Sequence, residues 1–217
     1  MPLQSANVPS IIVLMLPYFI LGYFCGAIPF GMVFGKFFCG IDPRTAGSCN
    51  VGATNIARLC GKKWGAATLI CDASKGLLPI LLITGIGPYT GESAFIAASL
   101  ALGAIFGHMF SCFLKFKGGK GVATTVGVFL VMHPLSLVIS ASLCIFAIWR
   151  TGFVSVGSLV MASLLPPLLF FFGQVVSGVA ALIISALVIL AHRENIKRLL
   201  KGTEKTWFPA KKDSQDK

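Results

Sequence analysis

The chain has 217 residues, of which 56% are hydrophobic and 12% are charged, and its mean hydropathy is +0.87. Soluble domains carry about 25% charged residues, so this composition excludes a soluble enzyme, a disordered chain and a coiled coil, and it predicts an integral membrane protein. The net charge of +11 favours cytoplasmic loops, anionic lipids or anionic substrates, and no basic stripe interleaved with aromatic residues points to nucleic acid.

The first predicted element is a membrane span near the N-terminus. The first charged residue is Lys36, whereas a cleavable signal peptide opens with a basic region, so we read residues 11–33 as a retained span. A long polar stretch follows this span and includes the cations Arg44, Arg58, Lys62 and Lys63.

The next two apolar segments cover residues 65–86, which include Asp72 and Lys75, and residues 93–114, which include His108. Intramembrane charges are costly unless they are paired or wetted. We interpret Asp72 and Lys75 as a structural pair near the interface, with a proton or ion pathway as the alternative. For His108 we favour a hydrogen-bonded packing residue over a site residue.

Two longer uncharged segments complete the apolar part of the chain. Residues 121–149 have His133-Pro134 in their middle and fit either one kinked span or a pair of short spans. Residues 151–191 are long enough for two spans, with a break near residues 173–178.

The distribution of Lys and Arg decides between these alternatives. Cations accumulate in cytoplasmic loops, and only a pair of short spans places residues 44–63, residues 115–120, Arg150 and the basic tail on one face. We therefore expect an all-α bundle of seven transmembrane helices, with the N-terminus outside and the C-terminus in the cytoplasm. The two middle spans would have about 14 residues each, against the usual 17–25. Residues 1–217 would form one domain, with 208–217 as a flexible tail.

The cysteines are odd in number and form no C-x-x-C pair and no metal-ligand spacing with a histidine. We expect them to be small buried hydrophobic residues that stay reduced. They are Cys25, Cys39, Cys49, Cys60, Cys71, Cys112 and Cys144.

Three polar segments fall on the predicted cytoplasmic face. The first, residues 47–58, combines small residues, hydroxyls, amides and Arg58 without an acid. Backbone N–H groups of closely spaced Gly and Ser can turn towards an anion, and Arg can bind phosphate with two parallel hydrogen bonds. This pattern indicates a phosphate site, and an ordinary polar loop with helix caps is the alternative.

The second polar segment, residues 116–125, contains Gly-Gly-Lys-Gly at the start of an apolar helix. It is not a Walker A motif, because Leu114 stands at the position of the first Gly and Gly121 follows Lys120 where Ser or Thr is required. Glycines around a lysine at a positive helix end still favour an anion site. A flexible positive-inside loop is the alternative.

The third polar segment, residues 192–204, is expected to continue the last span as far as a stop at Gly202. His192 and Asn195 are three residues apart, so both can face the mouth of the bundle. Glu194 and Arg198 are four apart, a spacing that allows them to pair on the helix surface. The alternatives are cations that extend to lipid headgroups and a histidine with a local interfacial partner.

Together these segments resemble the bacterial membrane acyltransferases that use acyl phosphate to acylate glycerol 3-phosphate, the PlsY-type family. The family motif Ser-Gly-Asn-x-Gly-Ala-Thr-Asn-x-x-Arg is similar to residues 48–58, Gly-Gly-Lys-Gly-Val-Ala-Thr occurs at residues 118–124, and the third motif is similar to residues 192–204. Residues 26–31 and Asp72-x-x-Lys75-Gly76 also match, so the resemblance covers nearly the whole chain in order.

One position departs from the family pattern, because Cys49 replaces the usual Gly of the first motif. If the backbone there needs a positive φ, a cysteine would be strained by about 1 kcal/mol. It would also put a thiol beside the site.

The resemblance implies a seven-span protein of the bacterial inner membrane, whose active site opens to the cytoplasm and needs no metal or cofactor. The catalytic residues would be Ser48, Arg58, Lys117, Lys120, His192 and Asn195. The substrate-binding residues would be Asn50, Gly52, Thr54, Asn55, Gly118, Gly119, Gly121 and Thr124. Structural support would come from Glu204, Asp72 and Lys75. Partners would be acyl phosphate, glycerol 3-phosphate, membrane lipids and the enzyme that makes the acyl phosphate.

An acyl phosphate is a mixed anhydride with a good leaving group, so we expect the 1-hydroxyl of glycerol 3-phosphate to attack it directly, without an acyl-enzyme. The proton would pass to a substrate phosphate oxygen or to His192. No His-x-x-x-x-Asp pattern, which the acyltransferases with soluble donors carry, is present. The alternative class is a transporter of an anion or a lipid phosphate, which broken spans would suit.

Overall fold

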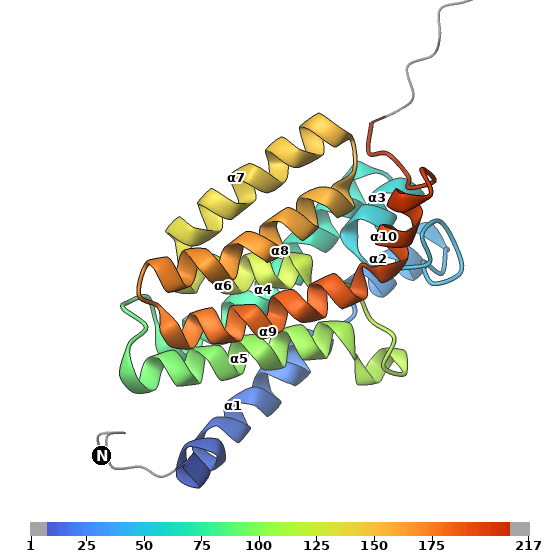
Figure 1. Cartoon of the computed structure of the whole chain (residues 1–217). Coiled ribbons are helices and arrows are strands. Elements are labelled where there is room, and N and C mark those ends of the chain that lie inside the picture. The colour runs from blue at the N-terminus through green and yellow to red at the C-terminus, as the bar shows by residue number, and fades with distance from the viewer. Residues whose placement is uncertain (1–7, 209–217) are drawn as a thin grey trace, which may run out of the picture.

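The computed structural model describes residues 8–208, and in that range it contains helices and turns without β-strands (Figure 1). The helices are α1 (Val8–Ala27), α2 (Phe30–Cys39), α3 (Ala53–Cys60), α4 (Lys62–Thr84), α5 (Gly91–Met109), the 3₁₀-helix η2 (Cys112–Leu114), α6 (Val122–Met132), α7 (Pro134–Thr151), α8 (Val154–Phe171), α9 (Val175–Ala191) and α10 (Arg193–Leu200). The predicted all-α membrane fold is confirmed. The expected tail lies outside the described residues, apart from Phe208.

The apolar helices differ in their capacity to cross a bilayer. By length and hydropathy, five described segments can span, namely Met15–Cys39, α4, α5, α7 and α8, and the bent pair α9–α10 would make a sixth. The expected number of seven requires α6 to cross as well. Since α6 has only 11 residues, it is about 16 Å long, against a hydrocarbon core of about 30 Å.

The first span is interrupted. We had expected a single span over residues 11–33 without a break. Helix α1 ends at Ala27, and α2 begins at Phe30. Pro29 lacks an N–H and disfavours a helical conformation at Ile28, so the helix breaks there. The candidate span nevertheless runs on to Cys39, so α2 covers the beginning of the stretch that we expected to be polar.

The middle of the chain forms the expected two helices, but their predicted lengths are wrong. Pro134 occupies the first turn of α7, where its missing N–H costs nothing, and this separates α6 from α7. Helix α7 has 18 residues because it continues through Arg150 and ends only at Gly152, which has a left-handed φ of 78°. The predicted break near residues 173–178 is confirmed, since Gly173 has a φ of 72° between α8 and α9.

Glycine contacts bring the two most closely packed helices, α1 and α5, together. A Cβ at Gly26 would lie 2.0 Å from the carbonyl oxygen of Ala104, and one at Gly107 would lie 2.0 Å from that of Tyr23. Small residues at such crossings let membrane helices approach backbone to backbone. Helix α5 is consequently the most buried span and lies beside α1, α4 and α9 (Figure 1).

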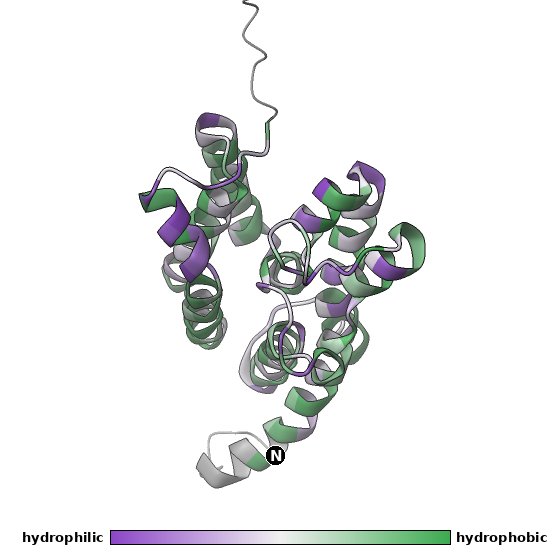
Figure 2. Ribbon diagram, turned by 90° about the vertical axis from the view of Figure 1, so that its right-hand side faces the viewer, coloured by the Kyte–Doolittle hydropathy of each residue, from purple (hydrophilic) through white to green (hydrophobic). Residues whose placement is uncertain are grey.

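The short helices α2, α3 and α10 lie at the same end of the bundle (Figure 1). Figure 2 looks towards this end and shows hydrophilic residues on the short helices and loops in front of the apolar helices. The fold therefore brings the three polar segments of the sequence to the same surface.

The cysteines do not all behave as expected. Cys39 at the end of α2 and Cys60 at the end of α3 form a disulfide that closes the loop carrying the first polar segment. Cys49 and Cys112 are exposed. The prediction of buried, reduced cysteines is therefore wrong at these four positions, because the two helix ends lie side by side and two loops face outwards.

Candidate active site

Asn55 organises the loop of the first polar segment from within. Its side chain is 2% exposed, and its Oδ1 accepts a hydrogen bond from the Ser48 backbone N–H at 2.8 Å. Its Nδ2 donates to the carbonyl oxygens of Pro43, Ala46 and Asn50. Because both ends of the amide are engaged inside the loop, Asn55 shapes the loop and is not oriented towards a ligand.

The rest of this loop leads into the N-terminus of α3. The Asn50 Oδ1 accepts from the Gly52 N–H at 2.8 Å, and Gly52 is the N-cap of α3. Ser48 and Thr54 are half-buried beside it. Cys49 has a φ of 54°, so the condition for strain at this departure from the family motif is met.

The second loop is anchored to the end of α5. The Gly118 N–H donates to the Met109 carbonyl at 2.9 Å, and the Gly119 N–H donates to the His108 carbonyl at 3.0 Å. A Cβ at Gly119 would lie 2.1 Å from the Nε2 of His108, so only glycine fits there. These two amides are engaged within the protein, whereas we expected them to contact substrate.

The other residues of the second loop divide into two groups. Gly121 has a φ of 83° and caps α6, and Lys120 extends towards the third segment. Thr124 is fully buried against α4. Lys117 is exposed and makes no ion pair or side-chain hydrogen bond within residues 8–208.

A hydrogen-bonded cluster joins the second and third segments. The Lys120 Nζ donates to the Asn195 Oδ1, and the Asn195 Nδ2 donates to the Glu204 Oε1 at 2.6 Å. Glu204 also accepts from the Ser155 Oγ at 2.8 Å and from the Arg198 Nε at 2.7 Å. Glu204 is therefore the centre of the cluster, and Arg198 pairs with Glu204 instead of Glu194.

The charges of the cluster perturb one another. Burial would raise the pKa of Glu204, but the hydrogen bonds from Asn195, Arg198 and Ser155 hold that pKa below its ordinary value. Burial lowers the pKa of Lys120 to about 8, and the nearby Arg198 and Arg58 act in the same direction while Glu204 opposes them. Three cations thus surround one carboxylate, which leaves a net positive potential for an anionic ligand.

The segment after α10 connects this cluster to the first loop. The Arg58 Nη2 donates to the carbonyl oxygen of Lys205 at 3.1 Å, and the Lys205 Nζ donates to the Gly47 carbonyl oxygen at 3.1 Å. Burial lowers the pKa of Arg58, and Arg198 lowers it further. Lys205, which directly follows the third segment, therefore links it to the first segment, and the second segment joins the third through Lys120 and Asn195.

His192 lies at a bend, not within a continuous helix as we expected. Helices α9 and α10 meet at an angle of 54°, with His192 between them. Its side chain is 3% exposed, and its Nδ1 lies 2.8 Å from the Val188 carbonyl oxygen, to which it donates. This contact assigns the proton to Nδ1 and leaves Nε2 as an acceptor.

Sequence reasoning missed three residues that the fold brings to the site: Ser155, Arg198 as a partner of Glu204, and Lys205. Ser155 lies near the start of the uncharged segment 151–191 and belongs to none of the three motifs. A buried acid such as Glu204 needs donors, and this requirement was the only signal available for them.

A shallow apolar hollow, open to the outside, lies along one face of α8. It has a volume of about 400 Å³ and is lined by Val156, Leu159, Val160, Ser163 and Leu164. The polar cluster itself offers cationic donors that can bind a phosphate.

Fold and site together define a helical integral membrane protein with a cluster of cationic side chains at one end of its bundle. Residues 16–202 match the sequence model of the family described as glycerol-3-phosphate acyltransferase. The chain belongs to this family, as its polar segments indicated.

Curated relatives and solved structures agree with this assignment. The glycerol-3-phosphate acyltransferase of Lawsonia intracellularis is 50% identical over 88% of this chain and 94% of its own length. That of Nitratidesulfovibrio vulgaris is 51% identical over 85% of this chain and 55% of its own. The crystal structure of PlsY, an integral membrane glycerol 3-phosphate acyltransferase, in its glycerol 3-phosphate form has a TM-score of 0.79 at 36% identity and covers 92% of this chain and 96% of that chain. Its lysophosphatidic acid form matches with the same score and identity, over 89% and 95%.

Proposed function

We propose that this protein transfers an acyl group from an acyl phosphate to the 1-hydroxyl of glycerol 3-phosphate, which yields lysophosphatidic acid and phosphate. The observation that carries the proposal is that Lys205 and the Lys120–Asn195 hydrogen bond link the three motif segments into one cationic cluster. The names of its relatives identify glycerol 3-phosphate as the acceptor of the acyl group. The several cations of the cluster support a second substrate that also carries a phosphate.

The cations of the cluster would bind the substrate phosphates. Arg58 and Lys120 come from different motifs. Lys120 is half-buried, which strengthens its attraction to an anion, and the exposed Arg58 can bind phosphate with two parallel hydrogen bonds. Lys120 would exchange its contact with Asn195 for a phosphate oxygen. Lys117 is exposed and unpaired among the described residues, so we assign it a steering role at the entrance.

The remaining candidates act at different distances from the substrate. Ser48, Asn50, Gly52 and Thr54 lie in the first loop and are proposed to contact phosphate. Asn55, Gly118, Gly119, Gly121 and Thr124 would keep the loops in shape through the contacts described above, and Glu204 would orient Asn195 and Arg198.

The reaction would be a direct transfer. The hydroxyl oxygen attacks the acyl carbon, the bond to the phosphate oxygen breaks, and the cations stabilise the charge on the tetrahedral oxygen and on the departing phosphate. The free Nε2 of His192, or a substrate phosphate oxygen, takes the proton. Holding both substrates in line contributes several kcal/mol, at most about 7–11.

The proposed topology places this cluster at the cytoplasmic face of the bacterial inner membrane. Seven crossings, with the short α6 included, put the N-terminus outside and gather the cationic loops on the inner side, as the positive-inside rule requires. The acyl-phosphate-producing enzyme would deliver its product to this face.

The test is an assay of purified protein with glycerol 3-phosphate and either acyl phosphate or acyl-CoA, in the presence of a chelator. We expect equal release of phosphate and lysophosphatidic acid from acyl phosphate alone. Arg58→Ala should lower the turnover by orders of magnitude, while Arg150→Ala, at the exposed end of α7, serves as the matched control with a mild effect.

Two outcomes would contradict the proposal. Inactive protein that moves phosphate across vesicle membranes would support the transporter. An acyl adduct on Ser48 or Cys49, detected by mass spectrometry in a single turnover, would replace direct transfer by an acyl-enzyme.

A further inference from the structure

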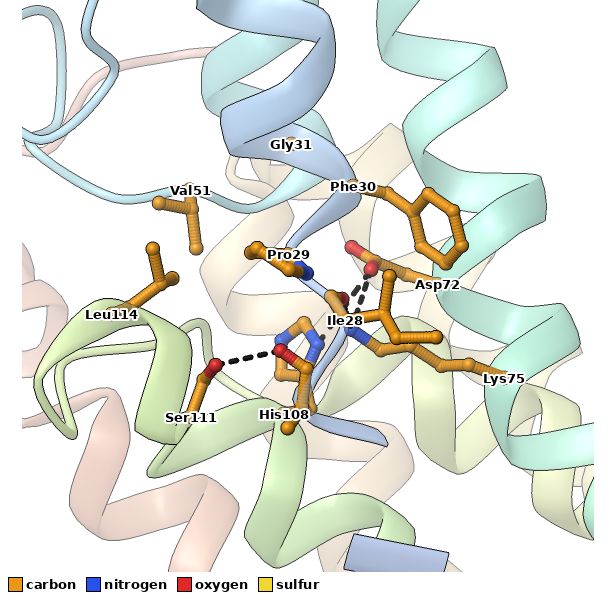
Figure 3. Close-up of a pocket in the computed structure, with 11 residues that line it drawn as sticks. Ile28, Pro29, Phe30, Gly31, Val51, Asp72, Lys75, His108, Ser111 and Leu114 are labelled. Carbon is orange, nitrogen blue, oxygen red and sulfur yellow. Dashed lines mark hydrogen bonds and ion pairs between the residues drawn. The ribbon is translucent and has the colours of Figure 1, made fainter. Parts of the chain in front are cut away.

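A small polar cavity lies inside the bundle, apart from the cationic cluster (Figure 3). It has a volume of about 10 Å³, and its polar lining comes from Asp72 and Lys75 of α4, His108 of α5 and Ser111. A cavity of this size with polar walls has room for one water molecule.

The break between α1 and α2 forms one wall of this cavity. Because Pro29 interrupts the helix, the carbonyl groups at the end of α1 need donors from elsewhere. The Lys75 Nζ donates to the Ile28 carbonyl oxygen at 2.9 Å, and the Ser111 Oγ donates to that of Ala27 at 2.6 Å (Figure 3). The intramembrane lysine thus supports a bend in the backbone.

Asp72 connects this wall to His108. Its Oδ1 lies 2.8 Å from the Lys75 Nζ, which pairs the two buried charges, but 3.7 Å from the His108 Nδ1. A separation of 3.7 Å is too long for a direct hydrogen bond. The Nδ1 of His108, whose side chain is 5% exposed, faces the cavity and has no hydrogen-bond partner among residues 8–208. A buried polar atom of this kind requires a partner.

The other side of His108 holds the second loop of the site. Its carbonyl oxygen accepts from the Gly119 N–H, and its ring packs against Gly119 so closely that no Cβ fits between them. Lys120 follows immediately and reaches Asn195. The orientation of the His108 ring therefore bears directly on the position of Lys120.

We propose that one buried water joins the Nδ1 of His108 to the Asp72 carboxylate, and that His108, held in this way, is a positioning residue for the Gly118–Lys120 loop. The inference rests on the proposed function in so far as Lys120 binds the phosphate of glycerol 3-phosphate. The Asp72–Lys75 pair then serves the site through His108, without a proton or ion pathway.

The kinetic test compares His108→Leu, which removes the water contact, with His108→Asn, whose amide restores a polar atom near the Nδ1 position. His108→Leu should raise the KM for glycerol 3-phosphate about tenfold or more, with the KM for acyl phosphate unchanged. His108→Asn should recover most of this loss. The matched control is His133→Leu, since His133 is another bundle histidine, which contacts Ser177 and not the loop.

A second variant tests the same role if His108→Leu does not fold. Asp72→Leu combined with Lys75→Met removes both buried charges together, so it avoids an unpaired charge, and it also removes the acceptor for the water. This pair should reproduce the raised KM. An unchanged KM in folded His108→Leu, or no rescue by His108→Asn, would overturn the positioning role.

A crystal structure in lipid tests the water independently of activity. We expect a density peak within hydrogen-bond distance of both the His108 Nδ1 and the Asp72 Oδ1, and a displaced Lys120 in His108→Leu. A dry cavity would refute the water. Wild-type protein without acyl-phosphate-dependent activity would refute the proposed function alone, because the position of Lys120 in the two structures still decides the role of His108.

Discussion

Replacement of Glu204 by Gln isolates the contribution of the single carboxylate in the cationic cluster. The substitution preserves shape, and one amide oxygen can still accept from Asn195 and Ser155 at the Oε1 position. At the Oε2 position an amide N–H₂ would face the Arg198 Nε, 2.7 Å away in the native protein, so two donors would oppose each other.

The magnitude follows from this one contact. A hydrogen bond to a charged group contributes about 1.5–3 kcal/mol, and the side chain of Arg198 is 35% exposed, which allows it to recover part of that from water. We therefore expect a loss of about 2 kcal/mol, which lowers the Tm of a chain of this size by about 4–8 °C. Since the Glu204 carboxylate also raises the pKa of Lys120, its loss should lower that pKa below about 8 and raise the KM for glycerol 3-phosphate.

The matched control is Glu194→Gln on the same helix. Glu194 is 58% exposed and pairs with Lys197 at the surface, where water and salt screen the ion pair, so its loss should hardly change the stability. Thermal unfolding and steady-state kinetics of both variants, measured in the same detergent, make the comparison. If Glu204→Gln has the same Tm and the same KM for glycerol 3-phosphate as Glu194→Gln, the carboxylate is not the centre of the cluster and the reasoning fails.

Three further predictions follow from the loops. The pKa of Lys120 is lowered to about 8, so its ammonium group is charged below that pH and neutral above it. The KM for glycerol 3-phosphate should therefore rise about tenfold for each pH unit above about 8. A rise that begins only near about pH 10 would indicate an exposed lysine instead. Cys49→Gly relieves a side chain at a φ of 54° and should raise the Tm by about 2–4 °C, whereas a lower Tm would contradict the strain. Cys39→Ser combined with Cys60→Ser opens a disulfide with a sequence separation of 21 and should cost about 3 kcal/mol relative to the oxidised protein, and an unchanged melting curve would show that the bond does not form.

Local signals were sufficient for part of the fold. Mean hydropathy and charge spacing identified a helical membrane protein, since apolar helices are one of the few ways in which a chain can satisfy its backbone in lipid. Pro134 and Gly173 marked helix boundaries because their backbone preferences act on their own neighbours. Pro29 also marks a helix boundary, but the apolar residues on both sides of it led us to predict one uninterrupted span.

The site was predicted as a set of segments but not as a set of contacts. The motifs named Lys120, Asn195 and Glu204 individually, whereas their connection depends on a fold that brings together residues 75 positions apart. The same fold engages the amides of Gly118 and Gly119 with the end of α5, which no pattern within the loop reveals.

The sequence by itself therefore determined the membrane class, the family and the chemical character of the three polar segments, because composition, hydropathy and motifs are sums over neighbouring residues. Only the tertiary structure decided that Arg198 pairs with Glu204 and not with Glu194, and that His108 lies between Asp72 and the Gly119 loop. Hydrogen bonds and ion pairs form over about 3 Å. Their partners therefore depend on how helices that are distant in sequence pack together, and local sequence patterns do not predict that packing.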